Sequence, residues 1–174
     1  MEKNNTQKSI YFIVTGALIA AAYAGLTFLS NVFGLAYGPI QFRISEVLTI
    51  LPVFTPAAIP GLTIGCFIAN IASFNMLDMI FGTLATLIAA ILTYLFRNVR
   101  FKGIPLLSML PPVLVNAVII GLEIDFFFLE EGATLWGFFL SAVEVGLGEL
   151  GVCYVVGIPF FLLVRKLRIF SSFS

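Results

Sequence analysis

Long apolar runs separated by short polar stretches dominate this 174-residue chain. A helix rises about 1.5 Å per residue, so about 20 apolar residues cross the roughly 30 Å of a bilayer core. We expect helices at about 10–33, 44–58, 60–75, 79–96, 105–125 and 136–164. Residues 44–75 are divided into a hairpin of two short helices because Pro56, Pro60 and Gly61 interrupt the run. The pattern predicts one domain over 1–174, an all-α integral membrane protein with six transmembrane helices.

Prolines leave some helix boundaries open. Pro111 and Pro112 can either kink the fifth helix or begin it. If they begin it, the helix runs to about Leu129 and brings Glu123 and Asp125 into the membrane. The sixth helix is longer than one crossing needs and contains Pro159, so we expect it to be tilted or kinked.

The charged residues predict the orientation of these helices. Only 10 % of residues are charged, against roughly a quarter in soluble domains, and the mean hydropathy is +1.11. Basic residues gather in three clusters: Lys3 and Lys8; Arg97, Arg100 and Lys102; Arg165, Lys166 and Arg168. Together with Glu2 these clusters carry a net charge of +7, and the rest of the chain carries −7. The positive-inside rule places all three clusters, and therefore both termini, in the cytoplasm. We expect a multi-pass protein of a prokaryotic plasma membrane.

Several chemistries have no support in the sequence. There is no histidine, the commonest metal ligand and general base. Cys66 and Cys153 are isolated in apolar helices, where we expect them to pack. No G-x-x-x-x-G-K-[ST] phosphate-binding loop occurs, and the basic clusters are too small to indicate nucleic acid. We therefore expect neither an enzyme nor a bound metal or cofactor.

Carboxylates at membrane depth are the main sign of a binding site. Six acids lie in or beside the apolar segments, and Arg43 is the only base near them. Such a group costs about 2.5–3.5 kcal/mol, even on insertion scales that give low values, and usually marks function. The excess charge must be protonated, hydrated or neutralised by a ligand, and we favour a ligand rich in donors or positive charge. The candidate substrate-binding residues are Gln41, Arg43, Glu46, Asn75, Asp78, Asn116, Glu123, Trp136, Glu144 and Glu149.

Glu144 is the first candidate among these acids. It enters the sixth helix by about two turns, and Gly148 and Gly151 on its face would leave a groove beside it. Glu46, Asp78 and Glu149 follow. Glu46 and Asp78 can equally cap helix N-termini, and Glu46 can pair with Arg43. Glu130 and Glu131 are expected to be solvated loop residues.

Three segments resemble a known family. They are Tyr37-Gly-Pro-Ile-Gln-Phe-Arg-Ile-Ser-Glu46, Asp78-Met-Ile-Phe-Gly-Thr-Leu-Ala-Thr86 and Gly148-Glu149. The chain resembles, over nearly its whole length, the queuosine-precursor transporter (QueT) family of substrate-binding (S) components of energy-coupling factor (ECF) importers. The resemblance implies a six-helix subunit that binds a micronutrient at the outer face. It also implies a transmembrane coupling subunit and two ATPase subunits, which would use the ATP.

Small residues on the first helix fit such a partner. Ala17, Ala21 and Gly25 recur at every fourth position, and so do Gly16, Ala20 and Ala24. Small residues allow close helix approach in lipid. The resemblance implies that this face meets the coupling subunit; packing inside the bundle is the alternative.

The implied ligand is a 7-deazaguanine: the aminomethyl form, the cyano form or queuine. Its N–H edge suits a carboxylate, and its carbonyl needs a donor from Asn, Gln or Arg. Its ring can stack on Trp136, Tyr37 or the Phe126–Phe128 run. An S component for another vitamin, a proton-coupled carrier of a small cationic or donor-rich solute that uses Glu144 and Glu149, and a scaffold or small membrane enzyme stay open.

Overall fold

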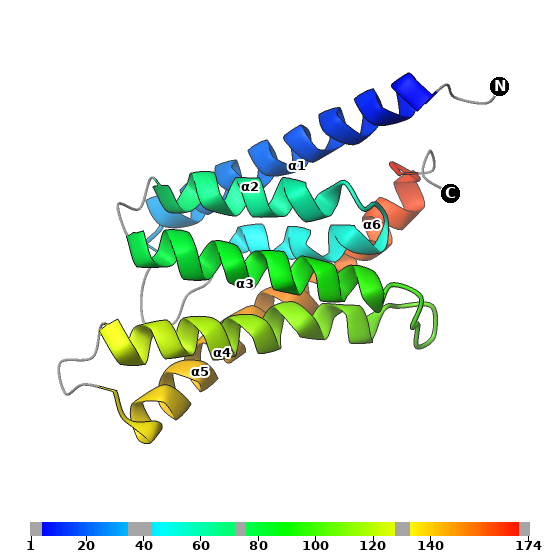
Figure 1. Cartoon of the computed structure of the whole chain (residues 1–174). Helices are drawn as coiled ribbons and strands as arrows, with labels where there is room; N and C mark the ends of the chain where they lie inside the picture. Colours follow the sequence, from blue (N-terminus) through cyan, green and yellow to red (C-terminus); the bar gives the residue numbers. More distant parts are fainter. Residues whose placement is uncertain (1–4, 35–42, 72–75, 128–132, 171–174) are drawn as a thin grey trace.

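The computed structural model describes residues 5–34, 43–71, 76–127 and 133–170, and this part of the chain is helices and short connections (Figure 1). The elements are α1 (Asn5–Val32), the 3-10 helix η1 (Ile44–Val53), α2 (Ala58–Ile71), α3 (Met76–Leu95), the 3-10 helix η2 (Leu106–Met109), α4 (Leu110–Phe127), α5 (Leu135–Leu150), the π-helix η3 (Gly151–Val156) and α6 (Gly157–Leu167). The described residues form no named strand; Phe101 and Ile104 make one isolated bridge.

The helical segments confirm the all-α membrane class. Four stretches are long and apolar enough to cross a bilayer, at Asn5–Val32, Met76–Leu95, Leu106–Phe127 and Leu135–Leu167. Two shorter apolar helices, Ile44–Val53 and Ala58–Ile71, occupy the predicted hairpin. Both chain termini lie at the same end of the bundle (Figure 1). We call the opposite end the distal end; it holds the C-terminal ends of α1, α2 and α4 and the start of α3 and α5.

Prolines explain where the helices depart from the expected boundaries. The second predicted helix is a 3-10 helix that contains Pro52 and ends at Val53. Pro111 and Pro112 lie in the first turn of α4, where a missing N–H costs no helical hydrogen bond. They begin this helix, and it runs to Phe127 with Glu123 and Asp125 inside it. The last helix, which we expected to be tilted or kinked, contains the π-helix η3, and this π-helix ends three residues before Pro159. Proline has no backbone N–H, so it interrupts the regular hydrogen bonds of an α-helix at this place.

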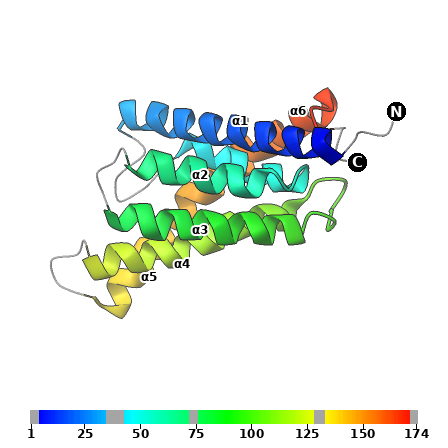
Figure 2. The same cartoon turned by 45° about the horizontal axis from the view of Figure 1, so that its top comes forward.

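Neighbouring helices pack in chain order, and glycines allow the closest contacts. Contacts run from α1 to α2, α3, α4 and α5 in turn, and η1, η3 and α6 pack together beside them (Figure 2). A Cβ on Gly65 would lie 2.7 Å from the carbonyl oxygen of Ala20, and one on Gly121 would lie 2.9 Å from Cα of Ala142. Such backbone contact replaces the hydrophobic driving force that is absent between helices in lipid.

Candidate functional site

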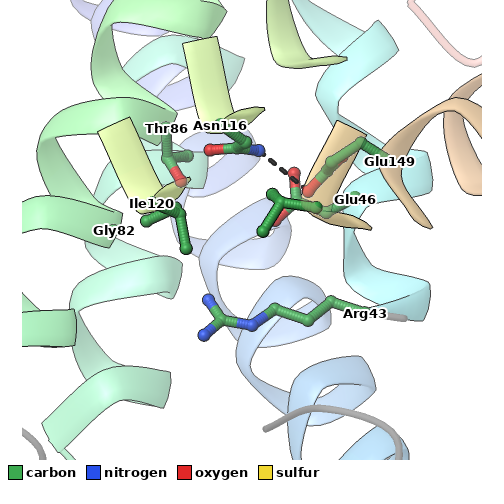
Figure 3. A pocket seen from close by; sticks show the side chains of 8 residues that line it. Arg43, Glu46, Gly82, Thr86, Asn116, Ile120 and Glu149 are labelled. Carbon is green, nitrogen blue, oxygen red and sulfur yellow. Dashed lines mark hydrogen bonds between the residues drawn. The ribbon is translucent and has the colours of Figure 1, made fainter. Parts of the chain in front are cut away.

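Side chains from η1, α3, α4 and α5 converge on a polar pocket in the bundle (Figure 3). It is lined by Arg43, Glu46, Gly82, Thr86, Asn116, Ile120, Val145 and Glu149. Its polar side chains are buried, yet they bring together two carboxylates, a guanidinium, an amide and a hydroxyl. The cavity has a volume of about 10 Å³, so it can hold about one water molecule. A ring-sized ligand therefore requires the surrounding helices to move apart.

Glu46 offers this pocket a free acceptor. Its Oε1 accepts a hydrogen bond from the hydroxyl of Tyr23 on α1. Its Oε2 is fully buried and has no hydrogen-bond partner in the described part of the chain. An unmet buried acceptor is costly, and a ligand donor at this oxygen would remove that cost.

Glu149 and Asn116 form a second polar pair across the pocket. Asn116 Nδ2 on α4 donates to Glu149 Oε1 on α5 at 2.9 Å, as Figure 3 shows. The Glu149 Oε2 atom lies 3.6 Å from Sγ of Cys153, which the π-helix η3 carries. Glu149 is thus already satisfied by the protein, whereas Glu46 keeps one oxygen for a ligand.

Arg43 connects the pocket to the distal end of α3. Its Nη2 pairs with Asp78 Oδ2 at 3.0 Å, and its Nη1 donates to Asn70 Oδ1 at 3.5 Å. Gly82 makes room for this network, because a Cβ there would lie 2.8 Å from Asn70 Nδ2. Burial alone would lower the pKa of Arg43, but Asp78 and other neighbours raise it above its ordinary value. The guanidinium therefore stays charged.

The structure changes the ranking of the acids that were expected, from the sequence, to bind the ligand. Glu144 is only half-buried and does not line the pocket, whereas Glu149 does. The two residues are five positions apart, so they point from clearly different sides of α5. The geometry of this pocket therefore favours Glu46 and Glu149 over Glu144 as ligand-binding acids. Trp136 is 69 % exposed and stacks on Phe139, away from the pocket.

The other candidate residues lie at different distances from the pocket. Arg43, Glu46 and Asn116 line it, and Asp78 is linked to it through its ion pair with Arg43. Glu123 is buried near them but is not part of the lining. Gln41 and Asn75, and the possible stacking residue Tyr37, lie outside the described residues.

Tyr23, Asn70 and Thr86 are site residues that the sequence reasoning did not identify. Tyr23 and Asn70 are held by contacts between residues 23 and 27 positions apart. Thr86 lines the pocket and donates to Cys66 Sγ at 3.2 Å. The one sign of these residues in the sequence is that each places a polar side chain inside an apolar helix. Thr and Tyr commonly occur in such helices without any role in binding. Both cysteines are free and buried, in keeping with packing roles.

The small residues of α1 divide into two faces. Ala17, Ala21 and Gly25 are exposed, and a Cβ on Gly25 would meet nothing within 4 Å. Ala20 and Ala24 are buried on the side that packs against α2. These two positions leave almost no surface for a partner, which favours the alternative that they pack inside the bundle.

Within the described residues, no group of three or more His, Cys, Asp or Glu side chains is arranged to hold a metal ion. The groups that the pocket presents to a ligand are hydrogen-bonding and charged side chains. Its acceptors and donors suit a small polar molecule.

Comparison with known proteins identifies the family of this chain. The family model described as "QueT transporter" matches residues 13–166. This chain belongs to the QueT transporter family. The resemblance inferred from the sequence motifs is thereby confirmed, and the family consists of transporters, not enzymes.

One similar protein gives the family match more detail. It is the "Queuosine precursor transporter QueT" of Lactococcus lactis subsp. cremoris (strain MG1363), 43 % identical over 102 residues. The match covers 59 % of this chain and 57 % of the relative, so it spans little more than half of either protein. No solved structure matches the chain significantly.

Proposed function

We propose that this member of the QueT family is the substrate-binding subunit of an ECF importer and binds a queuosine precursor of the 7-deazaguanine class in the central pocket. The observation that supports this proposal is that Oε2 of Glu46 has no partner among the described residues, at a pocket that also holds Asn116, Glu149 and Arg43. The similarity to the Lactococcus protein, a queuosine precursor transporter by name, supports the ligand class.

The pocket chemistry matches the polar edge of this ligand. A 7-deazaguanine presents a ring N–H and an exocyclic amine side by side, and a carboxylate can accept both. Glu46 is the first choice for that role, because its Oε2 has no partner among the described residues and its Oε1, which accepts from Tyr23, keeps a second lone pair for a ligand donor. Asn116 or Arg43 can donate to the ligand carbonyl once the helices separate.

Specificity follows from the same groups. Adenine presents an acceptor where guanine has its ring N–H, so it would leave Glu46 facing a lone pair. A site built to receive a donor typically rejects an analogue that lacks it. We therefore expect the purified chain to retain a 7-deazaguanine rather than adenine. Mass spectrometry of the small molecule that copurifies with the chain tests this assignment; another vitamin in its place would overturn it.

The exposed face of α1 supports the partner assignment. Ala17, Ala21 and Gly25 form a surface of small residues, so a partner helix can approach the α1 backbone closely. The chain has no phosphate-binding loop of its own, which fits a subunit that depends on ATPase partners.

Replacement of Ala21 by Trp tests this surface. The bulky ring should abolish uptake but leave ligand binding to the isolated chain unchanged. Leu84→Trp, on an exposed position of α3, serves as the control and should transport normally. Loss of binding by Ala21→Trp would show that this face belongs to the substrate bundle instead.

A proton-coupled carrier is the second candidate function. Two buried carboxylates, Glu46 and Glu149, line one pocket, and such groups form proton relays in secondary transporters. Uptake assays separate the two functions: an ECF subunit loses uptake when the ATPase subunits are deleted. A proton-coupled carrier loses it only when the proton gradient is collapsed.

A further inference from the structure

Glu123 is a buried carboxylate that the central pocket does not use. Its side chain lies in the last two turns of α4, and the residue is 2 % exposed. Neither Oε1 nor Oε2 has a hydrogen-bond partner in the described part of the chain. Two unmet acceptors on one buried carboxylate are expensive, so the group must be protonated or must meet a donor or cation that arrives from outside.

The helix registers place Glu123 next to the pocket on its distal side. Asn116, Ile120 and Glu123 share one face of α4, and the first two line the pocket. On α3, Asp78 stands one turn to the distal side of the lining residue Gly82. Helices α3 and α4 pack against each other. Asp78 and Glu123 therefore each lie about one turn to the distal side of a residue that lines the pocket, Gly82 on α3 and Ile120 on α4.

The charge balance at this position favours a cation. Asp78 already holds Arg43 at 3.0 Å, and Arg43 is the one basic residue of the sequence outside the three clusters. One guanidinium cannot neutralise both Asp78 and Glu123. A ligand with one positive charge and several N–H donors would complete the balance.

We propose that Glu123, assisted by Asp78, forms an amine subsite that binds a positively charged group on the ligand and selects charged over neutral 7-deazaguanines. This inference rests on the proposed function. With the guanine edge on Glu46, the substituent at position 7 lies on the other side of the bicyclic ring. Glu123 lies about one helical turn, roughly 5.4 Å along α4, beyond the lining residue Ile120, so an aminomethyl arm on the ring would extend toward it.

Binding of two ligands that differ in this substituent tests the subsite. The full-length chain in detergent is titrated with 7-aminomethyl-7-deazaguanine, a cation, and with 7-cyano-7-deazaguanine, which is neutral. The wild-type protein should bind the amine at least about tenfold more tightly, in line with a charge-assisted hydrogen bond. Equal affinities would overturn the proposal without any variant being needed.

Glu123→Gln then assigns the preference to one residue. It should weaken binding of the amine about tenfold or more and leave the nitrile within about twofold, and Glu123→Asp should restore part of the preference. Asp125→Asn is the matched control, because Asp125 is equally buried on α4 but accepts a hydrogen bond from the Thr134 backbone N–H. Its ligand preference should equal that of the wild type.

The results that would contradict the amine subsite differ from the result that would contradict the proposed function. An equal loss for both ligands in Glu123→Gln would make Glu123 a packing residue, and no loss for either would remove it from the site. If the wild-type chain binds neither ligand, the proposed function itself fails and the subsite falls with it.

Discussion

At the scale of single residues, the site is defined by which buried polar atoms are satisfied. Asn116 satisfies one oxygen of Glu149, and Asp78 pairs with Arg43. Glu46 Oε2 and both oxygens of Glu123 have no partner among the described residues. Glu46 lines the pocket, and Glu123 lies about one turn from the lining residue Ile120, so these two carboxylates can still accept hydrogen bonds from a ligand.

The Arg43–Asp78 pair should behave as a mutually dependent unit. Removal of one partner leaves a buried charge uncompensated, which typically costs about 3–5 kcal/mol. We expect Arg43→Met and Asp78→Asn each to lower the unfolding midpoint of the purified chain strongly. The loss of stability in the variant that carries both substitutions should be clearly smaller than the sum of the losses in the two single variants. Additive losses in unfolding experiments would show that the ion pair contributes no coupling.

At the scale of elements, the sequence predicted where helices occur better than it predicted their kind. Apolar runs marked all six segments, because lipid requires each backbone to satisfy its own hydrogen bonds. The 3-10 geometry of η1 and the π-helix η3 depend on local proline positions and on packing, which a hydropathy pattern does not contain.

The same limit explains the exchange of Glu144 for Glu149. Both acids lie on α5 at membrane depth, and only the rotation of that helix against α4 decides which one faces inward. The contacts Asn116–Glu149 and Tyr23–Glu46 join residues 33 and 23 positions apart, beyond any local pattern. The Gln-Phe-Arg-Ile-Ser-Glu run did locate Arg43 and Glu46, because these two residues lie together in a short motif.

Glycine contacts between helices give a prediction at this scale. In Gly65→Ala the new Cβ would lie 2.7 Å from the Ala20 carbonyl oxygen and 2.8 Å from Cβ of Tyr23, so α1 and α2 must separate. Over-packing of this kind typically costs about 1–3 kcal/mol, and the thermal midpoint in detergent should fall. Gly25→Ala is the control, because its Cβ meets nothing within 4 Å and should leave the midpoint unchanged or raise it. Equal midpoints for the two variants would contradict the close α1–α2 contact.

At the scale of the whole molecule, the bundle has two chemically different ends. Figure 1 shows that α1 begins, and α3 and α6 end, at the end opposite the distal end, and the described basic residues of the three clusters lie in or next to these segments. Asp78 at the start of α3 and Glu123 near the end of α4 lie toward the distal end. A ligand that arrives from outside would thus meet carboxylates first. The inward-facing assignment of the termini is a prediction from charge, to be tested by labelling.

Cysteine labelling in intact cells tests this orientation. In a background with Cys66→Ala and Cys153→Ala, single cysteines at Gly38 or Gly132 should react with an impermeant maleimide from outside. A cysteine at Gly103, in the connection between α3 and η2, should react only after the membrane is opened. Reaction of the Gly103 position in intact cells would reverse the proposed topology.

The central claim is that Glu46 reads the donor edge of a 7-deazaguanine, and calorimetric titration of the purified chain tests it most directly. Glu46→Gln keeps the shape but turns an acceptor into a group that can present N–H to the ligand's own donors. The affinity should fall about a hundredfold or more, as expected when a charged hydrogen-bonding partner is lost. Glu144→Gln, outside the pocket, should bind as the wild type does. Normal affinity in Glu46→Gln, or an equal loss in Glu144→Gln, would contradict this account of the site.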